Sequence, residues 1–280
     1  MIRTVWLLLA GLVITVVLST RVLLATYLRS RRITGVCDRV SRFWCRALLR
    51  MGGARVRFQG LERLDWSEPM VIVANHQSWF DVFALGAHLP ANRRFVGKEE
   101  LARIPIFGPA WLACGHIAID RSDRERAIES LEKAADRARE ERLALVFFAE
   151  GTRSWDGRLQ PFKKGAFVFA IQAGLPVVPL GISGSRAIMK KGSFRVRPGE
   201  IRVRVGRPIS VDGLEHEDRD RLLEEARSAV AALMEDPDGV TGQPGGAATA
   251  TEDGRKGEQG RDGTDRSSTY TTGDWKEMTR

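Results

Sequence analysis

The sequence contains little cysteine. Cys37, Cys45 and Cys114 are the three cysteines among 280 residues, an odd number without metal-binding or redox spacing. We expect small thiols, buried or next to a membrane, in a reducing compartment. The four histidines form no zinc set with them. The sequence therefore predicts no structural metal, and no cofactor is expected.

The motifs of three other protein classes are also missing. The phosphate-binding pattern Gly-x4-Gly-Lys-Ser/Thr does not occur, which disfavours a nucleotide-binding protein. The esterase pattern Gly-x-Ser-x-Gly is absent, since residues 181–185, Gly-Ile-Ser-Gly-Ser, miss its spacing. No nucleic-acid reader motif or interleaved aromatic stripe occurs, so nucleic acid is not an expected partner.

Acidic residues are nearly absent from the first 60 positions. These positions hold eleven Arg and one acid, Asp38, for a net charge of +10. The whole chain carries a net charge of only +9, so the remainder nearly balances. Clustered Arg beside an apolar segment favours an anionic membrane surface as a partner.

Long apolar runs are confined to the N-terminal segment. A helix over residues 5–28 would be roughly 36 Å long, enough to span a bilayer with some tilt. A helix lying deep in one leaflet remains an alternative. A cleaved signal peptide is disfavoured, because the segment continues past Arg21 without a small-x-small site. Arg29, Arg31 and Arg32 follow directly, so the positive-inside rule predicts a cytoplasmic remainder.

Residues 36–50 have the pattern of a basic amphipathic helix. Apolar side chains, including Phe43 and Trp44, alternate at helical spacing with Arg39, Arg42, Arg46 and Arg50. The pattern favours a helix in the headgroup layer with an interfacial Trp. The alternative is a helix packed on the domain with solvated arginines.

The body of the chain alternates between strand and helix patterns. Strands are expected at 55–58, 71–74, 93–96, 117–119, 143–148 and 176–182, and helices near 79–88, 122–141, 164–173 and 217–235. Residues 195–205 are expected to form a hairpin that turns at 198–200 and has one wet face at a sheet edge. Its arginines are solvated edge charges or, alternatively, ligands. Buried apolar strands between helices predict an α/β domain with a largely parallel sheet flanked by helices.

Residues 71–81, Val-Ile-Val-Ala-Asn-His-Gln-Ser-Trp-Phe-Asp, hold the most informative pair of side chains. The apolar run predicts a buried strand that delivers His76 into a loop. If Ser78 caps the next helix, Asp81 lies in its first turn and folds toward His76, where it would fix the tautomer of a general base. The alternative is a capping box between Ser78 and Asp81 with an incidental loop histidine.

A second loop, residues 148–154, Phe-Ala-Glu-Gly-Thr-Arg-Ser, follows the strand pattern at 143–148. Together, His-x4-Asp and Glu-Gly-Thr-Arg-Ser resemble the glycerolipid acyltransferase family, the group that includes 1-acylglycerol-3-phosphate acyltransferases. Residues 97–101, 115–121 and 178–182 fit the same pattern in the right order. The resemblance covers roughly residues 60–210. It implies an acyltransferase domain, which we place at 59–236. The apolar run predicts an N-terminal membrane anchor (1–33), and the basic pattern predicts a helix and link (34–58). The Gly-rich remainder, which has no periodic apolar pattern, is predicted to be a disordered tail (237–280).

The resemblance implies roles for individual residues. His76 would be the base and Asp81 its orienting partner. Lys98 and Arg153, and less strongly Arg121, would hold the acceptor phosphate, which suits the planar fork of Arg. The supporting loop residues would be Asn75, Glu150, Gly151 and Thr152. Three questions stay open: whether Glu150 binds substrate or backbone donors, whether amides near Gly151 stabilise an oxyanion, and whether His116 is packed structure or a second base.

The implied reaction is acyl transfer to the sn-2 hydroxyl of lysophosphatidic acid in phospholipid biosynthesis, at a membrane and on its cytoplasmic side. The donor would be acyl carrier protein or acyl-coenzyme A, and the charge pattern does not decide between them. Alternative acceptors are glycerol-3-phosphate, a lyso-aminolipid or another lysophospholipid. A membrane lipid-binding protein without activity is the non-enzymatic alternative.

Overall fold

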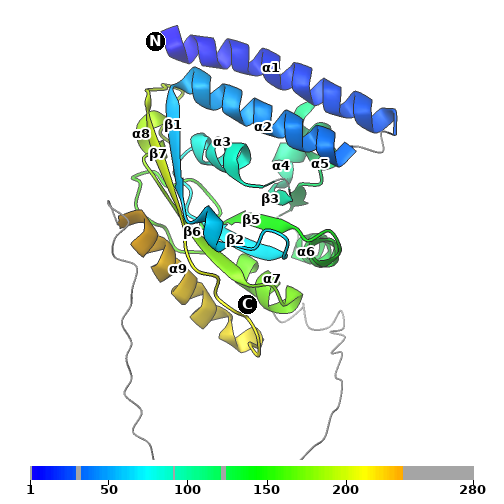
Figure 1. The fold of residues 1–280 in the computed structure, drawn as a ribbon, viewed down its shortest axis with the longest axis vertical. Helices are drawn as coiled ribbons and strands as arrows, with labels where there is room; N and C mark the ends of the chain where they lie inside the picture. Colours follow the sequence, from blue (N-terminus) through cyan, green and yellow to red (C-terminus); the bar gives the residue numbers. More distant parts are fainter. Residues whose placement is uncertain (1, 30–32, 91, 121–123, 236–280) are drawn as a thin grey trace, which may run out of the picture. The chain divides into compact units, whose positions relative to one another are not determined.

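The computed structural model describes residues 2–29, 33–90, 92–120 and 124–235. Its centre is a seven-stranded sheet in the order β1-β7-β6-β2-β5-β3-β4 (Figure 1). The strands are β1 (Ala54–Gln59), β2 (Met70–Ala74), β3 (Arg93–Lys98), β4 (Ile117–Ile119), β5 (Ala144–Phe148), β6 (Val177–Ser183) and β7 (Gly199–Val205). All neighbouring strands run parallel except β6 and β7. The predicted α/β class with a largely parallel sheet is confirmed.

Helices cover both faces of this sheet. They are α1 (Ile2–Tyr27), α2 (Ile33–Gly52), α3 (Trp79–His88), α4 (Glu99–Ala102), α5 (Phe107–Ala113), α6 (Arg124–Glu140), α7 (Gly165–Ala173), α8 (Ser185–Ile188) and α9 (Arg219–Glu235). Figure 1 shows α1, α2, α3 and α5 on one side of the sheet and α7 and α9 on the other. The central strands β2 and β5 are almost entirely buried between these layers, which explains their continuous apolar sequences.

The predicted hairpin over residues 195–205 is wrong. Only Gly199–Val205 forms a strand, and this strand lies inside the sheet between β1 and β6. The residues before it are held by the helix layer, because the buried Val196 donates its N–H to Thr4 Oγ1 of α1 (3.1 Å). The second half of the alternating pattern forms a strand, but the first half, residues 195–198, does not pair with a strand.

α1 is the one helix of the described residues that is long and apolar enough to cross a membrane, by length and composition. Leu7, Gly11, Ser19 and Val22 are buried on one of its faces, which packs against α2 and α5. Its other faces expose large apolar side chains: Ile2, Val5, Trp6, Leu8, Leu9, Leu12, Val13, Val16, Val17 and Leu24. The helix therefore lies against the domain and presents apolar surface outward.

α2 packs between α1 and α3, as the second of the two alternatives for residues 36–50 requires. Cys45, Leu48 and Leu49 are buried in this contact. The expected interfacial position of Trp44 is wrong, because its Nε1 donates to Thr15 Oγ1 of α1 (2.8 Å) and its ring packs on Phe83 and Phe107. Most of the apolar face of α2 is therefore used inside the protein, whereas the Phe43 side chain is exposed.

The expectation of three thiols also fails. Cys37 of α2 and Cys114, which follows α5, form a disulfide with their Cα atoms 5.3 Å apart. Cys45 is a buried thiol. The disulfide joins positions 77 residues apart in the sequence, so the local spacing of the cysteines could not predict it. The predicted tail, residues 237–280, lies outside the described residues.

Candidate active site

The site forms where two neighbouring parallel strands end. β2 and β5 are paired in register, with Ala74 opposite Phe148. Each strand delivers its polar loop to the same edge of the sheet, so the loops at 75–81 and 149–154 meet there. The Ser154 N–H donates to the His76 carbonyl (2.8 Å), which joins the two loops directly.

Asp81 is the centre of the first loop. One carboxylate oxygen, Oδ2, accepts from His76 Nδ1 (2.8 Å), from the Gln77 N–H (2.6 Å) and from the Ser78 N–H (2.8 Å). Ser78 Oγ in turn accepts from the Phe80 N–H (3.3 Å) and caps α3. The sequence left a His–Asp pair and a capping box as alternatives. The structure has both, and the same oxygen makes them.

His76 has its tautomer fixed by this geometry. An ionised carboxylate only accepts hydrogen bonds, so Nδ1 carries the proton and Nε2 keeps its lone pair. The imidazole stacks on the Phe148 ring at 3.9 Å between centroids and lines a cavity. The ring is thereby held so that Nε2 can accept a proton from a molecule bound in the cavity.

Asn75 and Glu150 serve the backbone of this site. Asn75 is fully buried, and its amide both donates to the Ile182 carbonyl (2.9 Å) and accepts from the Ile182 N–H (2.7 Å), which ties the end of β2 to β6. Glu150 is 3% exposed. Its two oxygens accept from the N–H groups of His76 (2.5 Å) and Gln160 (3.0 Å). Of the two roles left open for Glu150, the geometry fits the backbone role.

The environment of Glu150 is electrostatically unusual. Burial raises the pKa of this carboxyl to about 7, although the hydrogen bonds from His76 and Gln160 act in the opposite direction. The neighbouring Asp81 carboxylate contributes to raising the pKa of Glu150. The loop backbone of His76 is therefore held by a group that titrates near neutral pH.

A cavity of about 590 Å³ opens in front of His76. Its walls are mainly apolar and aromatic, and they come from α1, α2, α3, α5, β3 and the two strand-end loops. Lys98, Arg153, Gly151 and Thr152 also line it, so the structure brings these predicted residues to one space with His76. Arg121 lies outside the described residues.

Arg153 is partly enclosed at this cavity. Its guanidinium lies over the Trp79 ring, 4.8 Å from the centroid, and burial lowers its pKa. Gly151 has φ +72°, and its N–H donates a hydrogen bond to the Phe148 carbonyl (2.9 Å) inside the turn. That amide is therefore engaged by the protein itself, and the proposed oxyanion role of the amides next to Gly151 stays a prediction.

His116 is the second histidine on the cavity wall. Its Nδ1 accepts the Phe95 N–H (3.0 Å), and its ring stacks on Trp111. Burial lowers the pKa of His116 to about 3, and the positive charges of Arg94 and Arg93 add to this effect. The geometry matches the packed structural alternative for His116.

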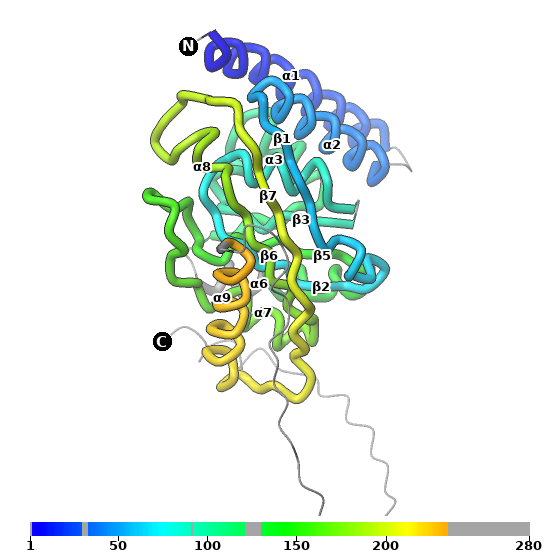
Figure 2. The backbone as a smooth tube through the Cα atoms, turned by 60° about the vertical axis from the view of Figure 1, so that its left-hand side comes forward, coloured from blue at the N-terminus to red at the C-terminus, as the bar shows by residue number. Residues whose placement is uncertain are grey.

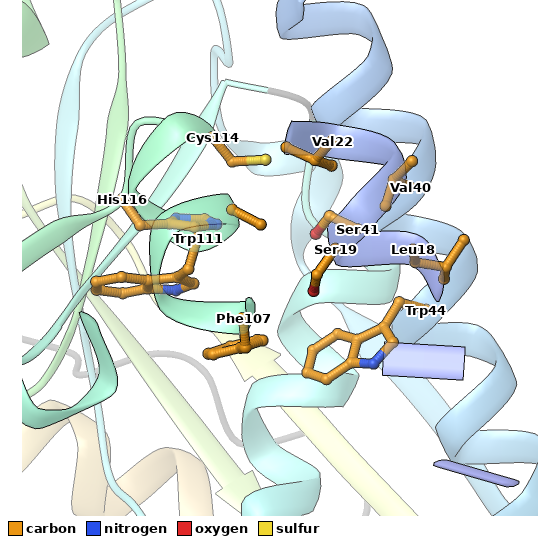
Figure 3. A pocket seen from close by; sticks show the side chains of 11 residues that line it. Leu18, Ser19, Val22, Val40, Ser41, Trp44, Phe107, Trp111, Cys114 and His116 are labelled. Atoms are coloured by element: carbon orange, nitrogen blue, oxygen red, sulfur yellow. The ribbon is translucent and has the colours of Figure 1, made fainter. Parts of the chain in front are cut away.

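A smaller cavity of about 70 Å³ adjoins the first between α1, α2 and α5 (Figure 3). Trp44, Phe107, Trp111 and His116 line both cavities. The labelled side chains of Figure 3 come from both sides, with Ser19 and Val22 of α1 facing the aromatic group. The long apolar helix thus forms a wall of the space in front of His76.

Sequence reasoning missed the aromatic lining and one cation. Trp79, the first residue of α3, stands inside the His-x4-Asp block, and its position beside the cap was a usable signal. Lys191 donates to Thr152 Oγ1 (3.0 Å) from a segment with no local motif. Trp111 comes from α5, which the sequence did not predict.

Fold and site together define a class: an α/β protein with a histidine–carboxylate pair and cationic side chains in the lining of a mainly apolar cavity. Residues 55–183 match the family model named Acyltransferase. The chain is 38% identical to a 1-acyl-sn-glycerol-3-phosphate acyltransferase of Cocos nucifera over 154 residues, 55% of this chain and 50% of that protein. A Caenorhabditis elegans relative, acl-2, provisionally named for the same activity, is 32% identical over 195 residues, 69% of this chain and 68% of its own.

A solved structure has the same fold. The crystal structure of the 1-acyl-sn-glycerophosphate (LPA) acyltransferase PlsC from Thermotoga maritima matches with a TM-score of 0.69 and 25% identity. The match covers 83% of this chain and 95% of that one. The chain belongs to the acyltransferase family, as its motifs indicated. It spans about half the length of the plant relatives.

Proposed function

We propose that the protein transfers an acyl group from an acyl thioester to the sn-2 hydroxyl of 1-acylglycerol-3-phosphate, giving phosphatidic acid. The observation that carries this proposal is the 2.8 Å contact between His76 Nδ1 and Asp81 at the wall of an apolar cavity. The names of the relatives support the choice of acceptor over other lyso-acceptors.

His76 acts as the base of this reaction. Its Nε2 takes the hydroxyl proton while the hydroxyl oxygen attacks the thioester carbon. The tetrahedral intermediate then expels the sulfur, and the imidazolium returns the proton to the leaving thiolate. Asp81 stabilises the imidazolium and keeps Nδ1 protonated throughout, so each turnover begins with the same tautomer.

Arg153 and Lys98 hold the phosphate of the acceptor at the cavity mouth. Both side chains line the cavity that contains His76, and Trp79 supports the Arg153 guanidinium from one side. A guanidinium binds phosphate with two parallel hydrogen bonds, which orients the glycerol as well as attracting its charge. Arg121 is a further candidate for the same phosphate.

The membrane is the source of the acceptor. The apolar outer surface of α1 is proposed to lie in lipid, and the packing of its inner face on α2 and α5 favours a helix embedded in one leaflet. Because α1 also lines the cavity through Thr15, a lysolipid reaches His76 from the leaflet without crossing water. The catalytic domain is proposed to face the cytoplasm, as the basic residues after α1 favour.

The donor is a soluble acyl thioester, either acyl carrier protein or acyl-coenzyme A. The reaction is tested with purified protein, radiolabelled acyl donor of each kind and lysophosphatidic acid in mixed micelles. Formation of labelled phosphatidic acid, absent with the His76→Ala variant, is the expected result. A wild-type protein that binds lysolipid but transfers no acyl group would leave the inactive lipid-binding alternative in its place.

A further inference from the structure

The segment between α8 and β7, residues 189–198, is strongly cationic and is called the basic loop below. It carries Lys190, Lys191, Arg195 and Arg197 and no acid. Its central side chain, Phe194, is 73% exposed. Exposure of a large aromatic ring to water is unfavourable. An anionic lipid surface can bury the ring and also bind the cations around it.

One end of the basic loop is fixed to the candidate active site. Ser78 Oγ, which caps α3 two residues after His76, donates to the Met189 carbonyl (2.7 Å). Lys191 donates to Thr152 Oγ1 (3.0 Å) and also lies over the exposed Trp155 ring, 4.7 Å from its centroid. The start of the loop therefore lies beside the cavity wall, next to Thr152.

The other end of the basic loop is fixed to α1. The Val196 N–H donates to Thr4 Oγ1 in the first turn of α1 (3.1 Å). This turn presents exposed apolar side chains, Ile2, Val5 and Trp6, on its outer surface. Figure 2 shows the tube between α8 and β7 reaching the N-terminal end of α1. The loop thus connects the cavity mouth to the apolar helix.

We propose that the basic loop is a membrane-docking surface separate from α1 and α2, with anionic lipid headgroups bound by its cations and Phe194 inserted at their level. An acidic protein would also match the charge. The exposed Phe194 and the contact with the apolar helix favour lipid, because they continue the surface of α1. The inference rests on the proposed membrane position of α1.

Docking of this loop has a consequence for the acceptor. Since Lys191 contacts Thr152, docking holds the cavity mouth in the headgroup layer, where the phosphate of a lysolipid lies. A lipid phosphate bound near Lys191 then lies beside Thr152, which precedes Arg153 in the chain. The loop concentrates anionic lipid next to the site in addition to anchoring the chain.

The test places a fluorophore on the loop of the full-length protein. Phe194→Cys is labelled and bound to vesicles that contain brominated phosphatidylglycerol, which quenches fluorophores at headgroup level. Cys45 is buried and the other two cysteines are paired, so the unmodified chain serves as the blank. Glu217→Cys, exposed next to α9 on the other side of the sheet, carries the control label.

We expect quenching at position 194 and none at position 217. Replacing both Arg195 and Arg197 by Gln should lower the docking equilibrium about 25-fold, since each basic residue near an anionic surface contributes about fivefold. Quenching at 194 should then fall to the control level. The matched pair Arg207→Gln and Arg221→Gln, also exposed, should leave quenching at 194 unchanged.

Two results would overturn the inference. The first is protein that floats with the vesicles while its label at 194 stays unquenched, and shielding of that label by acidic acyl carrier protein would then assign the surface to a protein. The second is protein that does not float with vesicles at all, which refutes the membrane position of α1 as well. Acyl transfer is not part of this readout, so failure of the proposed reaction leaves the quenching result standing.

Discussion

Two histidines line the same cavity, and their surroundings favour protonation of opposite ring nitrogens. At His76 the Nδ1 atom faces a carboxylate, and at His116 the Nδ1 atom accepts a backbone N–H. The first arrangement leaves a lone pair on Nε2, whereas the second leaves a proton there. His116 also has its pKa lowered to about 3 by burial and by Arg94 and Arg93. A histidine at a cavity wall is therefore a base only where a carboxylate supports its charged form.

The two histidines also differ in how far along the sequence their hydrogen-bond partners lie. His76 follows a buried strand and precedes a helix cap, so its partner comes from the same short segment. His116 lies between Gly115 and a short strand, and its partner comes from β3. Local spacing identifies the first pair. The second is visible only after the strands are placed side by side.

The largest effect is expected from His76→Ala. Loss of the base should lower kcat about 10³-fold, within the range for general-base catalysis, while thermal unfolding changes little because the loop backbone is held by Glu150 and Ser154. Rates of phosphatidic acid formation and a melting curve provide the measurement. His216→Ala, a histidine remote from the cavity, is the control. Residual activity above a tenth of wild type contradicts the assignment.

Asp81→Asn should lower kcat about 10²-fold. With its oxygen in the place of Oδ2, the amide can still accept all three hydrogen bonds, but a neutral side chain no longer stabilises the imidazolium that forms during the reaction. The expected signature is a fall in kcat with the acceptor KM nearly unchanged. An equal loss in both parameters would show that Asp81 acts through binding.

Glu150 should make stability depend on pH. Its pKa is raised in the folded protein to about 7, so the native state binds more protons than the unfolded state between pH values of about 4.5 and 7. Relative to Glu150→Gln, wild type should therefore lose about 2–3 kcal/mol of unfolding free energy as pH rises through that window. Denaturant titrations of both proteins at pH 4.5 and 8 measure this. A constant difference between the two proteins would show that the fold does not raise the pKa of Glu150.

Arg153→Lys should raise the acceptor KM about tenfold. The variant keeps the charge but loses the planar fork and its stacking on Trp79. Steady-state kinetics in each substrate separates the two KM values, and Arg158→Lys, on an exposed side chain, is the matched control. A defect confined to the donor KM would contradict the assignment of Arg153 to the acceptor phosphate.

The smallest effect is expected at His116. In His116→Asn the amide oxygen can accept the Phe95 N–H in place of Nδ1. We expect kcat within about threefold of wild type, because no proton transfer is lost, and a modest loss of stability from the missing contact with Trp111. A hundredfold loss of kcat with an unchanged melting temperature would make His116 a second base.

Much of the fold could be predicted because it depends on local pattern. The buried strands β2 and β5 and the capped helix α3 each carry their own signal, and the His76–Asp81 pair lies within six residues. What failed depends on distant partners. The Trp44 side chain of α2 contacts Thr15 of α1, and the disulfide joins two cysteines 77 residues apart in the sequence.

The failed hairpin has the same origin. An alternating pattern defines which side chains share a face, but it does not say whether a strand or a helix covers the backbone. Val196 is covered by α1 and Val203 by the sheet, although both belong to similar Arg-Val repeats. In the site, the role of Glu150 was left open for the same reason, since its partner Gln160 comes from beyond the loop.

Nitrogen NMR of protein labelled with ¹⁵N-histidine distinguishes the two tautomers directly, and the two cavity histidines are expected to hold opposite ones. We expect a protonated Nδ1 and a lone pair on Nε2 at His76, and the reverse at His116, with no titration of His116 between pH 8 and 5. Assignment uses the His76→Ala and His116→Asn variants. A protonated Nε2 with bare Nδ1 at His76, or a His116 ring that titrates above pH 5, would contradict it.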